Sequence, residues 1–269
     1  MMERTRSNME RTGWEKLQSA AYVAGSAAVR AGIFIGTAIE ENYRKIDPDV
    51  MRHLVQLPLL SFTLLIPKRD RIAPGKPDGH PPIIFVHGLG GNRGNFLLMS
   101  WYLRMLGRKR SYKIHFGPGQ SIEEMTAGLS RFIRDVLKAT GEKRVDIVAH
   151  SFGGIVVRLA IGKYRLARRV GTLVTLGTPH HGTYSARYAN TDITKAIRPD
   201  SALIKGLEKQ SWPGGVRGVT FWSRNDLMIL PSESAVVDGT TKIEVTPFTH
   251  YSYLIDPKSW IAVGNALGS

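Results

Sequence analysis

The 269-residue chain contains no cysteine, so it has no disulfide bonds, no thiolate zinc ligands and no cysteine nucleophile. It also lacks internal repeats and low-complexity segments, and its 28 glycines and 14 prolines are too few for a collagen-like or disordered chain. With 42% hydrophobic residues, a chain of this length can bury a full-sized core in one main domain.

Basic residues exceed acidic ones, with 37 Lys and Arg against 22 Asp and Glu and a formal net charge of +15. Residues 1–50 carry seven of each sign, so the excess lies further along the chain, mainly in 101–120 and 158–198. No nucleic-acid-binding motif accompanies these runs, and we expect no nucleic-acid partner. The basic patches are interpreted as solvated surface or as an attraction to anionic lipid surfaces.

Residues 20–39 (AAYVAGSAAVRAGIFIGTAI) are small and apolar except for Arg30. A cleaved signal peptide needs a purely positive start, and here charges of both signs precede the apolar stretch. A soluble packing helix and a membrane-associated helix both stay open, because the stretch is barely long enough to span a bilayer and its central arginine is costly. A cytoplasmic or membrane-associated location is favoured over secretion.

From residue 83 onward, short apolar runs alternate with amphipathic helical patterns, which is typical of a parallel sheet with helices on both faces. The predicted fold class is α/β, with a mostly parallel, doubly wound sheet flanked by helices and preceded by an extra N-terminal helical segment. In such sheets, functional residues gather at the carboxyl ends of the strands. The expected strands are 83–86, 112–116, 145–149, 172–176, 216–222 and 242–245, and the expected helices are 96–106, 122–140 and 154–166.

The sequence VDIVAHSFGGI at 145–155 predicts a buried strand, a tight turn and a helix in direct succession. Ser151 lies at the turn between Ala149 and Gly153, which matches a nucleophile elbow with alanine in place of the first glycine. Small residues are needed there because larger side chains would strike the neighbouring strand or helix. The turn would raise the Ser151 hydroxyl above the sheet, although the five-residue pattern alone also fits an ordinary strand-to-helix turn.

Three blocks of the sequence resemble bacterial lipases and related esterases of the α/β-hydrolase superfamily. They are FVHGLGG at 85–91, AHSFGG at 149–154 and LGTPHHG at 176–182. The alanine-containing turn resembles that of the small Bacillus lipases. The resemblance implies an α/β-hydrolase catalytic domain over 81–269, whereas 1–80 lies outside it as a helical and extended segment that packs on or anchors the core.

In this superfamily the triad follows the chain order serine, then aspartate or glutamate, then histidine. Of the histidines after Ser151, His180 and His181 come too early to follow the acid, so His250 is the expected general base. Asp226 follows an apolar, strand-like run and is the expected acid, although it could also be a simple cap or turn residue. The alternative acids are Asp200, Glu208, Glu233 and Asp238.

The resemblance also implies an oxyanion hole formed by the backbone N–H groups of Leu89 and Phe152. Glycines in the loop around Leu89 let the backbone approach a substrate, and a histidine there is expected to support the loop by hydrogen bonding. The supporting positions are His87, Gly88, Gly90 and Gly153.

Residues 183–212 lie between two expected strands, where this superfamily often carries a lid, and one surface helix with its loops is the alternative. The expected function is hydrolysis of an acyl ester or lipid substrate through an acyl-serine intermediate, without a metal or organic cofactor. The alternatives are an acyltransferase or thioesterase with the same triad, or a non-catalytic homologue that binds a membrane or a partner.

Overall fold

A computed structural model describes Gln56 and residues 72–268 of the chain. The expected helix at 20–39 lies outside these residues, as does most of the N-terminal segment 1–80. Among the residues that the structure describes, no helix has both the length and the apolar character needed to cross a bilayer.

Six parallel strands form the central sheet, in the order β2-β1-β3-β4-β5-β6. Because all strands run in the same direction, their carboxyl ends meet at one edge of the sheet. The α/β fold class with a parallel sheet is therefore confirmed. The strands are β1 (Ile83–Val86), β2 (Ser111–Lys113), β3 (Val145–His150), β4 (Val170–Leu176), β5 (Arg217–Trp222) and β6 (Thr241–Glu244).

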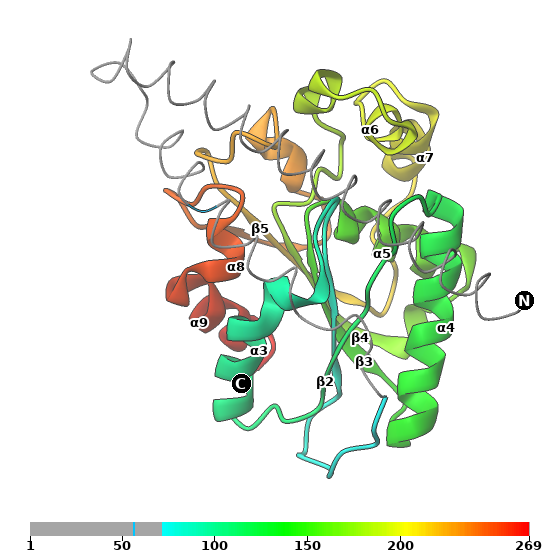
Figure 1. The fold of residues 1–269 in the computed structure, drawn as a ribbon, viewed down its shortest axis with the longest axis vertical. Helices are drawn as coiled ribbons and strands as arrows, with labels where there is room; N and C mark the ends of the chain where they lie inside the picture. Colours follow the sequence, from blue (N-terminus) through cyan, green and yellow to red (C-terminus); the bar gives the residue numbers. More distant parts are fainter. Residues whose placement is uncertain (1–55, 57–71, 269) are drawn as a thin grey trace, which may run out of the picture. The chain divides into compact units, whose positions relative to one another are not determined.

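Helices cover both faces of this sheet (Figure 1). Helices α4 (Ile122–Thr140) and α5 (Phe152–Lys163) pack on one face, and α3 (Leu97–Met105), α8 (Ser252–Ile255) and α9 (Pro257–Ala266) pack on the other. The shorter elements are α6 (Asp192–Ala196), α7 (Ala202–Glu208) and the 3-10 helices η2 (Arg93–Phe96), η3 (Ala167–Arg169), η4 (Tyr184–Tyr188) and η5 (Ser232–Ala235).

Strand β1 (IIFV) shows why these residues form a central strand. Ile83 and Phe85 point into one core and Ile84 and Val86 into the other, and all four side chains are fully buried. A strand buried on both faces needs a continuous apolar run rather than alternation of polar and apolar residues. The burial of β1 thus places the loop that follows it at the carboxyl edge of the sheet.

Helix α4 has clear start and stop signals. The Ser121 hydroxyl accepts the Glu124 N–H, while the Glu124 carboxylate accepts the Ser121 N–H in return. At the other end, Gly141 adopts φ 72°, a left-handed conformation that suits glycine. These signals explain why the predicted helix at 122–140 agrees with the structure.

The structure shifts several of the predicted boundaries. Strand β2 ends at Lys113 rather than 116, because the Phe116 N–H leaves the sheet and donates to Nε2 of His87. Helix α5 begins at Phe152 rather than 154 and ends at Lys163, just before Arg165 takes φ 53°. The predicted helix at 96–106 agrees with α3 (Leu97–Met105), which the 3-10 helix η2 (Arg93–Phe96) precedes.

A buried ion pair holds the amino-terminal edge of the sheet together. Arg108 donates to Oδ2 of Asp146 over 2.6 Å and also to the backbone carbonyls of Leu267 and Pro81. The second carboxylate oxygen of Asp146 accepts the Thr172 N–H over 2.9 Å. The pair thus joins the end of helix α9 to β3 and β4.

Replacing Arg108 with alanine is expected to lower the free energy of unfolding by about 3–5 kcal/mol, because the Asp146 carboxylate stays buried without its ion-pair partner. Denaturant titration of the purified chain measures this loss. Adding Asp146→Asn to the variant should recover part of the loss, since the amide keeps an oxygen for Thr172 and carries no charge. Equal stability of Arg108→Ala and the wild type would contradict this role.

Candidate active site

Ser151 lies on a sharp turn between β3 and α5. Its backbone has φ 53° and ψ −130°, and its N–H donates to the Leu176 carbonyl of the neighbouring strand over 2.9 Å. A positive φ is uncommon for a residue with a side chain and costs on the order of 1–3 kcal/mol. The surrounding fold therefore holds Ser151 in this strained conformation, which fixes the direction of its side chain.

Residues without side chains surround the turn. A Cβ atom at Gly88 would lie 2.8 Å from Cβ of Ser151, and one at Gly153 would lie 2.6 Å from the His87 carbonyl oxygen. A Cβ atom at Gly154 would lie 2.2 Å from Oγ1 of Thr178. Glycine at these positions therefore lets the loop after β1 and the start of α5 pack closely around Ser151.

His250 and Asp226 form a buried pair at the same edge of the sheet. The Nδ1 atom of His250 lies 2.9 Å from Oδ2 and 3.1 Å from Oδ1 of Asp226. Since a carboxylate only accepts, Nδ1 carries the proton, and in the neutral ring Nε2 is the lone-pair nitrogen. Asp226 is itself held in place, because its Oδ1 accepts the Met228 N–H over 3.0 Å.

The alternative carboxylates have other partners or positions. Glu208 contacts Nδ1 of His181, and Asp238 pairs with Lys242. Glu233 interacts with the neighbouring Ser232, while Asp200 is exposed. Of the five candidate acids, Asp226 therefore contacts the His250 ring in the part of the chain that the structure describes.

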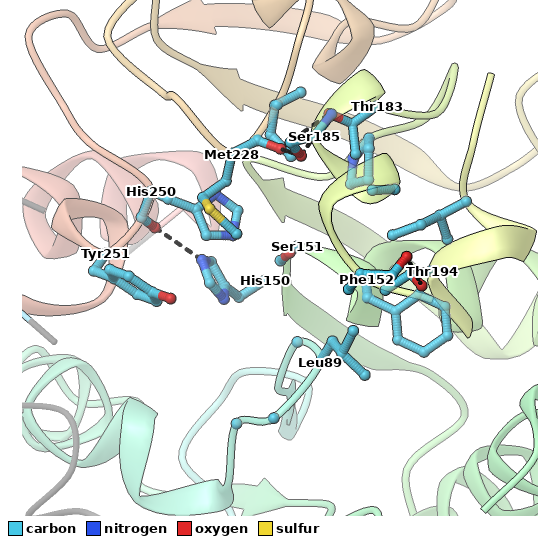
Figure 2. A pocket seen from close by; sticks show the side chains of 18 of the residues that line it. Leu89, His150, Ser151, Phe152, Thr183, Ser185, Thr194, Met228, His250 and Tyr251 are labelled. Carbon is cyan, nitrogen blue, oxygen red and sulfur yellow. Dashed lines mark hydrogen bonds between the residues drawn. The ribbon is translucent and has the colours of Figure 1, made fainter. Parts of the chain in front are cut away.

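Ser151 and His250 both line a cavity of about 480 Å³, the first cavity (Figure 2). Its wall is mostly apolar and comes from the loop after β1, the segment after β4 and the loop after β5. Apolar lining residues include Leu89, Ala186, Ile197, Leu227, Met228 and Ile229. A serine hydroxyl, an imidazole and an apolar wall thus share one space, with the Asp226 carboxylate behind the imidazole.

Comparison with known proteins finds similarity to esterases and lipases. Residues 79–198 match the family described as "Putative serine esterase (DUF676)". A triacylglycerol lipase from Pseudarthrobacter phenanthrenivorans is 29% identical over 126 residues, which cover 42% of this chain and 37% of that protein. The chain thus matches about a third of the length of this curated relative.

Two solved structures share the fold. Lipase B of Aspergillus fumigatus superposes with a TM-score of 0.60 at 16% identity, covering 76% of this chain and 55% of that one. The mature lipase BlEst2 of Bacillus licheniformis gives 0.59 at 20% identity, covering 72% and 96%. The chain thus has the α/β-hydrolase fold, and over part of its length it is similar to lipases and esterases.

The loop after β1 carries Leu89, which lines the same cavity as Ser151. Leu89 and Phe152 both line the first cavity, and the Leu89 side chain is 48% exposed whereas that of Phe152 is buried (Figure 2). Phe152 is the first residue of α5, where backbone N–H groups have no partner within the helix. Leu89 and Phe152 thus both lie at the cavity that Ser151 lines, and the role of their N–H groups as an oxyanion hole stays a prediction.

His87 holds this loop against β2 in a neutral form. Its Nε2 accepts the Phe116 N–H over 3.0 Å, so the proton lies on Nδ1, which is 2.9 Å from the Gly88 carbonyl oxygen. Burial lowers the pKa of His87 to about 4. Both ring nitrogens are thus used in supporting the loop.

Acid should destabilise the fold partly through His87. Between its ordinary pKa of 6.5 and the folded pKa of about 4, the unfolded chain binds a proton that the folded chain does not. Stability is therefore lost as the pH falls through this window, by about 2–3 kcal/mol from this residue at about pH 4.5. Burial also lowers the pKa of His150 and His180, so the wild type loses more than this.

Denaturant titrations at about pH 7 and about pH 4.5 on the wild type and on His87→Asn isolate the contribution of His87. The variant should be less stable at neutral pH but should lose less stability on acidification. An identical acid-dependent loss in both proteins would show that His87 is protonated in the folded state.

Three site residues were not predicted from the sequence. The ring of His150 contacts the backbone carbonyl of His250. Gly177 lies close to both Tyr253 and Asp226, because a Cβ atom at Gly177 would be 2.6 Å from Cε2 of Tyr253 and 2.8 Å from Oδ2 of Asp226. Burial and the Asp226 charge raise the pKa of Tyr253, so its hydroxyl stays protonated. The GTP motif at 177–179 was a visible signal for Gly177, but nothing local indicates the partners of His150 or Tyr253.

Hydrogen bonds join the start of the 183–212 segment to the loop after β5, which carries Asp226. The Thr183 hydroxyl donates to the Met228 carbonyl and accepts the Leu230 N–H, and the Ser185 hydroxyl also donates to Met228 (Figure 2). Elements η4, α6 and α7 follow within the segment. The first part of the expected lid-like insertion is thus a hydrogen-bonded wall of the first cavity.

The described residues also bear on metal binding. Within Gln56 and residues 72–268, no three His, Cys, Asp or Glu side chains gather as metal ligands would.

Proposed function

We propose that this α/β-hydrolase cleaves carboxylic esters through an acyl-serine intermediate, with Ser151 as nucleophile, His250 as general base and Asp226 as the acid that orients the base. The observation that carries the proposal is the Asp226–His250 pair at 2.9 Å, whose imidazole lines the same cavity as Ser151. With Nδ1 bound to the carboxylate, the lone pair of Nε2 is the one that can accept the serine proton.

In the first half-reaction, Oγ of Ser151 attacks the ester carbonyl carbon while its proton passes to Nε2 of His250. The carbonyl oxygen gains the negative charge, and the N–H groups of Leu89 and Phe152 donate to it. The intermediate then collapses: the bond to the alcohol oxygen breaks, and His250 returns the proton to that oxygen. The products of this half are a free alcohol and an acyl ester on Ser151.

In the second half-reaction, water attacks the acyl carbon and gives its proton to His250. Collapse of the second intermediate releases the carboxylic acid and returns the proton to Ser151. Asp226 stays ionised throughout and stabilises the imidazolium that forms twice in each turnover. No step needs a metal or an organic cofactor.

The apolar wall of the first cavity supports an acyl ester or lipid as the substrate. An acyltransferase or thioesterase would use the same triad and differ only in the acceptor or the leaving group. Purified protein assayed with p-nitrophenyl esters, triglyceride emulsions and acyl-CoA separates these functions. Fast hydrolysis of oxygen esters with water as the acceptor supports the proposal, and turnover of acyl-CoA alone would contradict it.

A non-catalytic homologue that binds a membrane or partner is tested with a fluorophosphonate probe. An activated serine reacts with this probe, so mass spectrometry should find the label on Ser151. A chain that neither takes the label nor hydrolyses any ester would be a binding protein that retains only the fold.

A further inference from the structure

A second cavity of about 910 Å³ adjoins the first one across a single loop. Both cavities are lined by residues 88–92 and by Phe152, whereas Ser151 and His250 line only the first. The partition between the two spaces is therefore the loop that carries the Leu89 N–H. A substrate bound at Ser151 lies within one loop's thickness of the second cavity.

The lining of the second cavity suits an apolar group. Its apolar side chains come from the same loop, from the segment after β2, from α4, from the start of α5 and from α6. They are Leu89, Phe116, Ile122, Met125, Phe152 and Ile193. The charged side chains are Arg93 against Glu123 and Asp192, so the cavity has no excess of positive charge that an anionic headgroup would require.

Open space lies beside Gly90 in the loop that both cavities share. A Cβ atom at this position would meet no other atom within 4 Å, and the neighbouring Leu89 side chain lines both cavities with 48% of its surface exposed. This space is the place where a flexible chain would cross the loop, over the backbone of Gly90 and beside Leu89. Apolar area that a substrate buries along this path contributes about 0.8 kcal/mol per methylene group.

We propose that the second cavity holds a second apolar arm of the substrate, so that the preferred substrates are esters with two long apolar arms, one in each cavity. This inference rests on the proposed ester hydrolysis at Ser151. The expected substrate is a neutral ester whose acyl and alcohol parts are both long, in contrast to the ester of a short alcohol.

Two ester series test this inference. One series lengthens the acyl chain on a methyl ester, and the other lengthens the alcohol chain on a butanoate. For the wild type, kcat/KM should rise by at least tenfold along both series. A rise along only one series, or a preference for an ester with an anionic second arm, would overturn the inference.

Two variants assign the cavities to the arms. Ile193→Trp narrows only the second cavity, and Leu227→Trp narrows only the first, so each should flatten the length dependence along a different series by at least tenfold. Equal effects of both variants on both series would contradict two separate arms. If the wild type hydrolyses no ester and Ser151 takes no fluorophosphonate label, the proposed function itself fails, which is a different result.

His150, the residue before the serine, contacts the backbone of His250. Its Nε2 lies 2.9 Å from the backbone carbonyl oxygen of His250, and Figure 2 shows this contact spanning the two loops. A carbonyl can only accept, so Nε2 of His150 carries the proton. The ring is buried, and this burial holds the pKa of His150 well below its ordinary value, which keeps the ring neutral.

His250 is therefore held at two points: its Nδ1 by Asp226 and its carbonyl by His150. Since His150 is bonded directly to Ser151 along the chain, this hydrogen bond links the position of the general base to that of the nucleophile. We infer that His150 is a positioning residue for His250 in the proposed reaction. A displacement of about 1 Å between reacting groups can cost on the order of 100-fold in rate.

Two amide variants separate positioning from general packing. The amide nitrogen of His150→Gln reaches about as far as Nε2 and can donate to the His250 carbonyl, whereas that of His150→Asn ends near the position of Nδ1. His150→Asn should lose roughly 10- to 100-fold in kcat with KM nearly unchanged, and His150→Gln should recover most of the loss. Equal kcat values for the two variants would overturn the inference.

NMR of the wild type labelled with ¹⁵N-histidine gives a test that does not depend on folding of the variants. His150 should show the Nε2–H tautomer without titration between about pH 5 and about pH 8. A protonated Nδ1 in neutral His150, or a normal titration, would contradict the hydrogen bond to His250. Absence of ester hydrolysis with this tautomer present would refute the proposed function while leaving the contact intact.

Discussion

Replacing Ser151 with alanine is expected to lower kcat for ester hydrolysis by on the order of 10⁵-fold or more. Alanine has no oxygen to form the acyl intermediate, so the remaining rate would reflect only substrate binding and the proposed N–H donors of Leu89 and Phe152. The measurement is the initial rate of p-nitrophenyl butanoate hydrolysis by wild type and variant, with matching thermal midpoints as evidence of folding.

Ser185 provides a matched control, because it lines the same cavity and its hydroxyl already donates to the Met228 carbonyl. The fluorophosphonate should still label Ser151 in Ser185→Ala and should label nothing in Ser151→Ala. Ester turnover by Ser151→Ala at more than a few per cent of the wild-type rate would refute the proposed nucleophile.

Asp226→Asn is expected to reduce kcat by about 10⁴-fold with a small change in KM. The amide carries no charge to stabilise the His250 imidazolium, and its NH₂ group facing Nδ1 favours the wrong ring tautomer. The fold should survive, since the amide keeps an oxygen for the Met228 N–H. Steady-state kinetics of the purified variant measure the loss.

Asp238→Asn is the control for a general effect of removing a carboxylate. Asp238 is an alternative acid by chain order, yet it pairs with Lys242, a residue outside the first cavity. Its removal should leave kcat within about twofold, because a surface ion pair contributes little. A loss in Asp238→Asn comparable to that in Asp226→Asn would contradict the assignment of the acid.

The predicted elements agree with the structure where the signal is local. Helix α4 follows from a capping box, an apolar face and a terminal glycine within one segment, and β1 follows from four consecutive apolar residues. The boundary of β2 was missed because it depends on His87, a residue 29 positions away that accepts the Phe116 N–H. Long-range contacts of this kind leave no periodic pattern in the sequence.

The sequence alone determined where the strands lie along the chain, the parallel α/β class and the turn at Ser151. These features depend on apolar periodicity and small residues, which act over a few positions. Tertiary structure decided which of five carboxylates meets His250, since that contact joins loops 24 residues apart. It also decided the contact of His150 with the His250 backbone, 100 residues away, and the second cavity beside Leu89. These features arise only when the strands align and bring their carboxyl ends together at one edge.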